Sequence, residues 1–211
     1  MSRRRVVLWR HGQTAWNLEH RFQGKTDIPL DEKGVAQAER AARLLAALQP
    51  TAILSSPLQR AARTADALAA ITGLPVSHDP DLTERDGGAW EGLTNAEIRQ
   101  RFPAEYAVWQ PPGGETGAEV AKRVGAALER AIGRLPADGL LVVASHGAAL
   151  RLGLAQLLGF PEGLWDRLGG LSNCSWSVVG EMRDGGWRLV EHNAGTLPEP
   201  VLSDDRAVAD T

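Results

Sequence analysis

Two histidine–glycine pairs, each directly after an apolar run, are the positions of this sequence best suited to carry chemistry. In the first, VVLW at 6–9 leads into RHG at 10–12; in the second, LLVVAS at 140–145 leads into HG at 146–147. An apolar run that ends in polar residues and glycine is typical of a buried strand followed by a loop. Each imidazole would then lie at the carboxyl end of a strand, where open α/β sheets bind their ligands.

The first of these pairs has the residue types that a phosphate site needs. Arg10, His11 and the nearby Asn17 bring a guanidinium, an imidazole and an amide into one turn. Gly12 allows a close backbone approach or a positive φ, so amide N–H groups can face an anion beside the imidazole. Taken alone, this stretch fits a polar loop equally well. The second strand–His–Gly unit favours the functional interpretation.

A second arginine is expected at the start of a helix. Ser56 followed by Pro57 is a favoured N-cap before proline at the first helical position, which predicts a helix over 58–72. Arg60 lies one turn into this helix, close to the N-terminus, where anions are favoured. By itself, a helical arginine is more often simply solvated. Arg60 becomes a candidate phosphate-binding residue only in combination with the other motifs.

The candidate acid is Glu84, in the glycine-rich stretch LTERDGGAWEG at 82–92. A carboxyl group in an apolar, partly desolvated loop has its pKa raised toward the range that is useful for proton donation. Asp86 and Glu91 are rival acids in the same loop, and ordinary solvation is the simpler role for both.

Strands and helices alternate along most of the chain. Two capping boxes, TNAE at 94–97 and TGAE at 116–119, mark helix starts. Strands are predicted near 6–9, 51–55, 75–78 and 140–145, and helices near 32–48, 58–72, 116–135 and 148–158. This order favours an α/β fold with a mostly parallel sheet covered on both faces. Two further strands, at 175–179 and 187–191, flank a Gly-Gly turn and predict a C-terminal antiparallel hairpin.

Length and composition limit the domain count and the class of partner. The 211 residues suit a single domain, predicted over 1–195, with a polar tail at 196–211 that we expect to be mobile. The net charge of −3 argues against a nucleic-acid partner. Cys174 is the only cysteine, which is typical of a reducing compartment, and neither a signal-peptide core nor an apolar stretch of about 18 residues is present. We therefore expect a cytoplasmic protein without a membrane partner.

Taken together, the motifs resemble those of the histidine phosphatase superfamily, the phosphoglycerate mutase-like group. RHGQT at 10–14 resembles the family signature, SPLQRA at 56–61 the second motif, 82–92 the acid loop, and SHG at 145–147 the late histidine motif. The resemblance extends over nearly all of residues 5–160. It implies a three-layer α/β/α sandwich around a mostly parallel sheet.

The resemblance also implies a mechanism. His11, as a neutral imidazole with a reference pKa of ~6.5, would attack phosphorus and form a phosphohistidine. Glu84 would protonate the departing oxygen and then, as a carboxylate, deprotonate the attacking water. No metal or cofactor is needed, because cationic side chains neutralise the phosphoryl oxygens. The residues implied in phosphate binding are Arg10, Asn17, Arg60, His146 and Gly147, and His146 is counted as catalytic as well.

Three other interpretations remain open. A mutase would return the phosphoryl group to a second hydroxyl, but residues 102–116 are short, apolar, proline-rich and without Lys or Arg, which favours hydrolysis. A metal enzyme could use His11, His146 and Glu84 as ligands, although neither histidine has a partner at ligand spacing. The third is a catalytically inactive phosphate-binding module with the same fold.

The substrate is expected to be a small phosphorylated metabolite such as a sugar phosphate. The stretches at 169–176 and 187–189 are similar to those of actinobacterial members that dephosphorylate glucosyl-3-phosphoglycerate. The exposed edge of the hairpin would suit a homodimer. The candidate substrate-binding residues are Gln23, Gly24, Trp90, Glu115 and Thr116.

Overall fold

The computed structural model describes residues 3–195, so the predicted tail at 196–211 lies outside the described residues. The strands are β1 (Arg5–Arg10), β2 (Ala52–Ser55), β3 (Val76–His78), β4 (Leu140–Ser145), β5 (Trp176–Glu181) and β6 (Trp187–Ala194). The α-helices are α1 (Ala15–Leu18), α2 (Glu32–Ala47), α3 (Gln59–Thr72), α4 (Asn95–Arg101), α5 (Pro103–Ala107), α6 (Gly117–Ile132) and α7 (Gly147–Leu157). Three 3-10 turns, η1 (Pro80–Leu82), η2 (Gly88–Trp90) and η3 (Glu162–Arg167), complete the set.

The six strands form one mixed sheet in the order β3-β2-β4-β1-β5-β6. Strands β3, β2, β4 and β1 run parallel, whereas β5 pairs antiparallel with both β1 and β6. The predicted α/β class, the mostly parallel sheet and the C-terminal antiparallel hairpin are confirmed.

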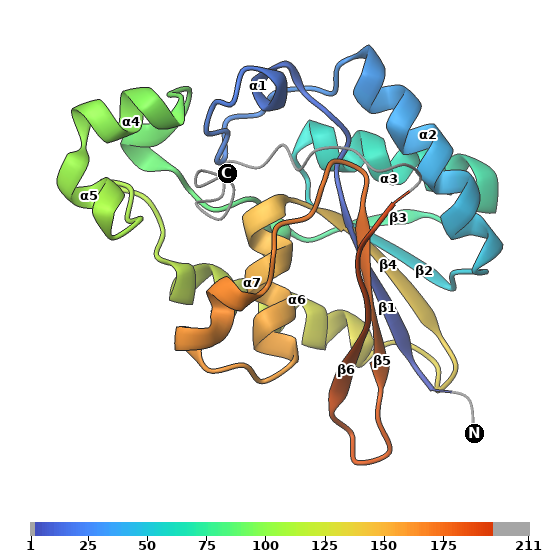
Figure 1. Ribbon diagram of the computed structural model, residues 1–211. Helices are drawn as coiled ribbons and strands as arrows, with labels where there is room; N and C mark the ends of the chain where they lie inside the picture. Colours follow the sequence, from blue (N-terminus) through green and yellow to red (C-terminus); the bar gives the residue numbers. More distant parts are fainter. Residues whose placement is uncertain (1–2, 196–211) are drawn as a thin grey trace.

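Helices cover both faces of the sheet, as Figure 1 shows. Along β1, Val6 and Leu8 point into a core shared with α6 and α7, whereas Val7 and Trp9 point into a core shared with α2 and α3. This alternation follows from the two-residue period of a strand that is buried on both sides. Because both faces of β1 are packed, its end is a rigid support for the residues that follow it.

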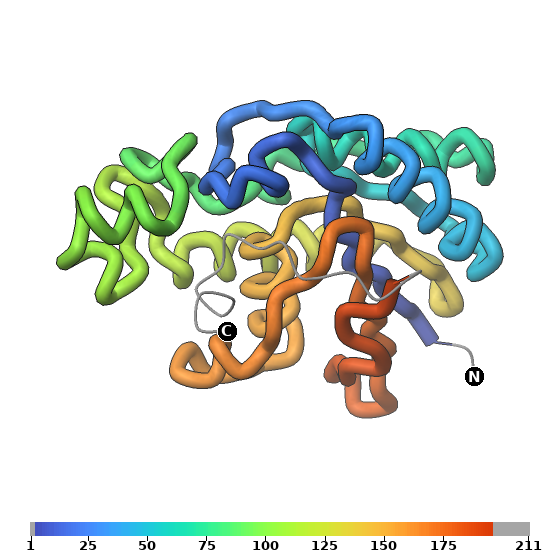
Figure 2. Tube along the Cα trace, turned by 45° about the horizontal axis from the view of Figure 1, so that its top comes forward, coloured from blue at the N-terminus to red at the C-terminus, as the bar shows by residue number. Residues whose placement is uncertain are grey.

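A smaller helical arm projects from one side of this sandwich, drawn in green in Figure 2. It contains α4 and α5, and its core is formed by the buried Phe22, Trp90 and Ile98, with Tyr106 and Trp109 packed against them. Trp90 packs edge-on against Phe22 and Trp109, with ring centroids 5.8 and 5.1 Å apart. No helix within residues 3–195 is long and apolar enough to cross a membrane.

The predicted bounds of α2, α3 and α7 agree with the structure to within one residue, the end of α6 and the cap of α3 differ, and the short helices α1 and α5 were not predicted. Both predicted capping boxes are present, at Thr94 and Thr116. Helix α6 ends at Ile132, three residues before the predicted end, with Gly133 as its C-cap. The predicted N-cap role of Ser56 is wrong, because α3 begins at Gln59 with Leu58 as a cap that makes no side-chain hydrogen bond.

Candidate active site

The carboxyl ends of three adjacent strands, β2, β4 and β1, bring the predicted residues to one edge of the sheet. In the register, Arg10 lies opposite Ser145 and Ser55 lies opposite Ala144. The His11 amide N–H donates to the Ser145 carbonyl at 3.0 Å, which continues the pairing one residue beyond β1. The residues after the three strand ends therefore share one small volume.

His11 is held in one orientation by its own loop. Its side chain is 2% exposed, and Nδ1 lies 2.7 Å from the Gly12 carbonyl oxygen. A carbonyl only accepts hydrogen bonds, so Nδ1 must carry the proton, and Nε2 keeps its lone pair. A neutral imidazole with a free Nε2 is the form in which histidine can act as a nucleophile.

His146 is held in the opposite tautomer by two different partners. Arg60 Nε donates to His146 Nδ1 at 3.1 Å, and His146 Nε2 lies 2.8 Å from the Ser56 hydroxyl. The guanidinium only donates, so Nδ1 must be the acceptor and Nε2 carries the proton toward Ser56. Thus Ser56, which sequence reasoning assigned to a helix cap, instead fixes the second histidine.

The two imidazoles face each other with ring centroids 5.2 Å apart and planes 60° apart. Burial lowers the pKa of both histidines well below 6.5, and the charges of Arg60 and Arg10 lower it further. Both rings are therefore neutral at pH 7, as expected from the sequence for His11. An anion bound between them would offset the positive charge of the two guanidinium groups.

The same pKa shifts make the stability of the fold depend on pH. Below about pH 6.5 the unfolded chain takes up protons at His11 and His146, whereas the folded chain does not, so acid favours unfolding. We expect the melting temperature in phosphate-free buffer to fall as the pH is lowered from about 7.5 to about 5.5. The fall should be smaller in His11→Asn, and an unchanged pH dependence in that variant would contradict this reasoning.

Arg10 is a fully enclosed cation with an unused donor. It is 1% exposed, and its Nη1 donates to the Leu171 carbonyl at 2.5 Å. Its Nε has no hydrogen-bond partner within the described part of the chain. A buried N–H without a partner costs about 1–3 kcal/mol, and a phosphate oxygen would satisfy it. At Gly147, a Cβ would lie 3.6 Å from this guanidinium, so the start of α7 packs directly against Arg10.

Arg60 is completely buried and oriented by the loop that contains Gly24. Its Nη1 donates to the Thr26 carbonyl at 2.9 Å, and its Nη2 donates to the Gly24 carbonyl at 2.8 Å. Gly24 has φ +53°, a left-handed conformation that glycine adopts without strain. The predicted substrate residue Gly24 therefore contributes a carbonyl that holds Arg60 in place.

Asn17 and Gln23 belong to a buried polar cluster behind the first histidine. Thr14 and Asn17 form a capping box at the start of α1, and Thr14 Oγ1 lies 3.0 Å from Gln23 Oε1. Asn173 Nδ2 donates to Asn17 Oδ1 at 3.2 Å and to the His11 carbonyl at 3.1 Å. These contacts engage the oxygen of Asn17 and leave its amide N–H groups as the donors suited to an anion.

The histidine loop also rests on the first turn of α2 through a close glycine contact. Gln13 N donates to Gln37 Oε1 at 2.9 Å, and Asp31 N donates to the Gln13 carbonyl at 3.0 Å. A Cβ at Gly34 would lie 2.8 Å from the Gln13 nitrogen and closer still to its carbonyl oxygen. Only glycine at position 34 lets the loop lie this close to the helix.

We expect Gly34→Ala to destabilise the protein by about 1–3 kcal/mol and to lower activity, because the backbone of the histidine loop must move. Thermal or denaturant unfolding measures the first effect. Gly163→Ala is the matched control, since a Cβ there meets nothing within 4 Å. Equal stability of the two variants would show that the close contact does not matter.

Glu84 is buried beside the start of α7. It is 4% exposed, and its carboxylate accepts hydrogen bonds from the backbone N–H groups of Arg85, Ala148 and Ala149 at 2.8, 3.2 and 2.9 Å. The sequence predicted a partly desolvated, apolar environment for Glu84, and the structure adds three backbone hydrogen bonds to its carboxylate. Burial disfavours charge on the carboxyl group, but three backbone donors favour it, two of them at the N-terminus of α7.

The rival acids have other partners. Glu91 accepts from the backbone N–H groups of Lys25, Thr26 and Gly87 at 2.8, 3.0 and 3.0 Å, so it ties loop 23–27 to the acid loop. Asp86 accepts from Gly88 N at 2.9 Å and lies 3.5 Å from Lys25 Nζ. Both acids are thus engaged in loop structure, which leaves Glu84 as the candidate acid.

Three of the predicted substrate residues make structural contacts within the protein. Trp90 is 0% exposed in the core of the helical arm, so its side chain has no surface to offer a substrate. Thr116 caps α6 by accepting from Glu119 N. Glu115 pairs with Arg123 at 2.7 Å and accepts from Asp86 N at 2.9 Å. Patterns of residue type cannot distinguish these roles, because a polar residue near a motif can either face the ligand or support the loop.

Within residues 3–195, no group of three or more His, Cys, Asp or Glu side chains is arranged to hold a metal ion. Of the mixed ligand set considered from the sequence, His11, His146 and Glu84, the two histidines lie close to Arg10 and Arg60, whose charges repel a cation. The charges of this site suit an anion.

A profile of the histidine phosphatase superfamily (branch 1) matches residues 6–195. The chain belongs to the histidine phosphatase superfamily. It is 38% identical to the glucosyl-3-phosphoglycerate phosphatase of Mycolicibacterium vanbaalenii over 216 residues, covering 92% of this chain and 96% of that protein. A protein of Salmonella paratyphi C named probable phosphoglycerate mutase GpmB is 38% identical over 181 residues, covering 82% of this chain and 83% of that protein.

Solved structures agree with this assignment. The structure of a mycobacterial glucosyl-3-phosphoglycerate phosphatase in complex with VO3 superposes with a TM-score of 0.86 at 38% identity, covering 91% of this chain and all of that one. The resemblance noted from the motifs is thus confirmed, and the chain is a phosphatase of this family.

Four residues of this histidine phosphatase site were not identified from the sequence: Ser56 as a histidine partner, Gly34, Asn173 and Arg123. Gly34 could have been identified from the sequence. A glycine inside a helical pattern costs stability, so its presence there indicates that another segment packs closely against the helix. The other three gave no signal, because their roles depend on contacts between segments far apart in the chain. Asn173, for example, reaches His11 across 162 positions.

Proposed function

We propose that this phosphatase hydrolyses a small phosphomonoester through a phosphohistidine on His11, without a metal ion. The observation that carries the proposal is the hydrogen bond from His11 Nδ1 to the Gly12 carbonyl at 2.7 Å. It leaves the Nε2 lone pair of a neutral, buried imidazole next to two buried guanidinium groups. That arrangement suits attack on phosphorus better than any structural role.

In the first step, His11 Nε2 forms a bond to phosphorus and the bond from phosphorus to the substrate oxygen breaks. Glu84, in its protonated form, gives its proton to that departing oxygen. In the second step, Glu84 takes a proton from water, the hydroxide oxygen attacks phosphorus, and the bond to His11 Nε2 breaks. The products are an alcohol and inorganic phosphate, and Glu84 is protonated again.

The cationic side chains stabilise the charge that moves during both steps. Arg10 Nε is buried and has no partner within residues 3–195, so it is available to a phosphoryl oxygen. Arg60 lies beside His146, and the Asn17 amide completes the set. Donors held rigidly in a site that excludes water stabilise a transition state more than they would in solution.

The substrate that we propose first is glucosyl-3-phosphoglycerate, a sugar-containing phosphomonoester. The support is that relatives from Mycolicibacterium vanbaalenii and Mycobacterium tuberculosis, both named glucosyl-3-phosphoglycerate phosphatase, match 92% of this chain at 38% identity. The stretches at 169–176 and 187–189 also carried this resemblance in the sequence. Asn173 and Leu171 of the first stretch contact His11 and Arg10, so that stretch belongs to the site.

Phosphoglycerate mutation is the second candidate, because relatives named probable phosphoglycerate mutase match at 38% identity. The same phosphohistidine would serve both reactions, and they differ only in the acceptor of the phosphoryl group. Conversion of 3-phosphoglycerate into its 2-isomer, measured against phosphate release from the same sample, separates the two.

The test is phosphate release from a panel of monoesters in the presence of a chelator. The panel holds nitrophenyl phosphate, 3-phosphoglycerate, glucosyl-3-phosphoglycerate, and several sugar and nucleoside phosphates. We expect full activity with the chelator and the largest kcat/KM for glucosyl-3-phosphoglycerate. Activity that disappears with the chelator and returns with a divalent ion would overturn the metal-free mechanism. Equal kcat/KM values across the sugar phosphates would overturn the substrate proposal.

We also propose a cytoplasmic location, for which the single cysteine is the support. Fractionation of cells that express the tagged full chain would test it. The homodimer expected from the edge of the hairpin is likewise a proposal. It would show as a doubled mass in light scattering.

A further inference from the structure

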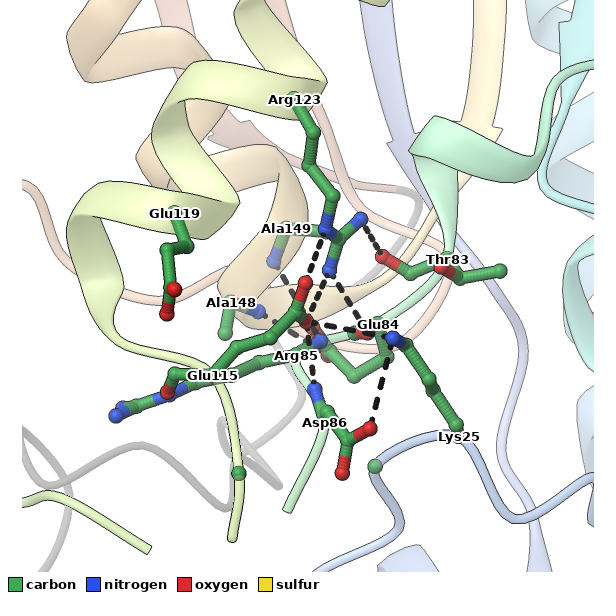
Figure 3. A network of polar contacts seen from close by, with 12 residues as sticks. Lys25, Thr83, Glu84, Arg85, Asp86, Glu115, Glu119, Arg123, Ala148 and Ala149 are labelled. Atoms are coloured by element: carbon green, nitrogen blue, oxygen red, sulfur yellow. Dashed lines mark hydrogen bonds and ion pairs between the residues drawn. The ribbon is translucent and has the colours of Figure 1, made fainter. Parts of the chain in front are cut away.

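The candidate acid loop is held from behind by one arginine of α6. Arg123 Nη1 donates to the carbonyls of Asp81 and Thr83 at 2.8 and 2.7 Å, and its Nη2 donates to the Glu84 carbonyl at 3.0 Å. Three backbone carbonyls that lead up to and include the acid thus converge on one guanidinium. Figure 3 shows Arg123 reaching from the helix toward this segment.

Glu115 completes the attachment on the other side of the acid. Its carboxylate accepts from Arg123 Nε and Nη2 at 2.8 and 2.7 Å, a two-point pairing with strong geometric preference. The same carboxylate accepts from Asp86 N at 2.9 Å. The backbone is therefore fixed before Glu84 by Arg123 and after it by Glu115.

The carboxylate of Glu84 accepts from the amides of Ala148 and Ala149 at the start of α7, in addition to the amide of Arg85 in its own loop. The backbone of the acid thus depends on α6 and its side chain depends on α7. Those two helices pack together in one core. Proton transfer requires the carboxyl group within hydrogen-bond reach of the departing oxygen, and an error of about 1 Å can cost ~100-fold in rate.

We propose that Arg123 and Glu115 are positioning residues that hold Glu84 at the distance required for proton transfer to the leaving group. The inference rests on the proposed role of Glu84 as the acid. In the described part of the chain, no hydrogen bond joins either residue to the phosphate cluster, by which we mean Arg10, His11, Arg60 and His146. Arg123 reaches that cluster only through its charge, the smallest of the causes that lower the pKa of His146. Lys25, which lies 3.7 Å from Glu115 Oε2, joins the same network from loop 23–27.

The test compares Arg123→Gln and Arg123→Lys with the wild-type chain on two kinds of ester. Nitrophenolate, released from nitrophenyl phosphate, is a weak base and departs with little help from an acid, whereas the strongly basic alkoxide of an alkyl phosphate must be protonated as it departs. We expect Arg123→Gln to lower kcat/KM about 10- to 100-fold for the alkyl phosphate that the wild type hydrolyses fastest, and less than about 3-fold for nitrophenyl phosphate. Arg123→Lys should restore part of the alkyl rate.

Two controls separate positioning from general damage. Arg130→Gln removes another arginine of α6, which pairs with Asp79 and Asp81 at 2.8 and 2.6 Å at the exposed start of the same loop. We expect it to leave both rates unchanged. Inhibition by inorganic phosphate reports the state of the phosphate cluster, and we expect the same inhibition constant in Arg123→Gln as in the wild type.

A double variant decides between the possible outcomes. If Arg123 acts through Glu84, adding Arg123→Gln to Glu84→Gln causes no further loss on the alkyl ester. Equal losses on both esters, a weaker phosphate inhibition, or additive losses in the double variant would each overturn the proposal. A Glu84→Gln variant that loses both ester activities equally would instead show that the acid is wrongly assigned, and the positioning role would fail with it.

Discussion

His11→Ala is expected to lose phosphatase activity by at least about 10⁴-fold while keeping the fold, because, of the two facing histidines, it removes the one whose Nε2 keeps a lone pair. The second histidine cannot substitute, because Ser56 and Arg60 occupy both of its nitrogens. Steady-state phosphate release from nitrophenyl phosphate measures the loss. Circular dichroism and the melting temperature report the fold.

The control for this prediction is His20→Ala. His20 has φ +54°, follows the end of α1, and is not one of the residues gathered at the ends of β1, β2 and β4. The activity of His20→Ala should equal that of the wild-type chain. A His11→Ala variant that is folded and retains more than about a tenth of the wild-type activity would exclude His11 as the nucleophile. A direct attack by water would then have to replace the two-step mechanism.

The second large effect is expected for Glu84→Gln, and it should depend on the leaving group. Loss of the proton donor should lower the rate on alkyl phosphates by about 10²- to 10⁴-fold and spare nitrophenyl phosphate. Glutamine keeps the size and can still accept from Ala149 N, so the loop should stay in place. Parallel rates on both ester types at one pH give the ratio.

Glu91→Gln serves as the comparison, because Glu91 lies in the same loop and holds Lys25, Thr26 and Gly87. We expect it to alter the two ester rates by similar factors, through loosening of the loops. If Glu91→Gln spares nitrophenyl phosphate and Glu84→Gln does not, then Glu91 is the acid and Glu84 the residue that holds the loop.

The sequence predicted what local patterns and motif spacing can determine. Strand ends, the alternation with helices, the C-terminal hairpin and both capping boxes could be read from periodicity, glycine and cap residues. The strands that carry Arg10 and His146 are indeed neighbours, with Arg10 opposite Ser145 in the register. Their resemblance to a family then gave the expected fold class, which the structure and the comparisons confirm.

The sequence could not determine which side chain faces which, because that depends on contacts between distant segments. Ser56 has the local signature of an N-cap, yet its hydroxyl lies 2.8 Å from a ring nitrogen of His146, 90 positions away. Trp90 and Glu115 sit in or near motifs and were assigned to substrate, but tertiary packing buries one and pairs the other with Arg123. Glu84 likewise meets amides of α7 that no local pattern reveals.

The central claim is a phosphoryl group carried by His11, and rapid-quench labelling tests it most directly. The enzyme is mixed with a substrate that carries a labelled phosphoryl group, quenched in alkali within one turnover, digested and analysed by mass spectrometry. The mechanism predicts a base-stable, acid-labile label on the peptide that contains His11, and none in His11→Ala. A label on any other residue, or full turnover with no labelled protein at any quench time, would contradict it.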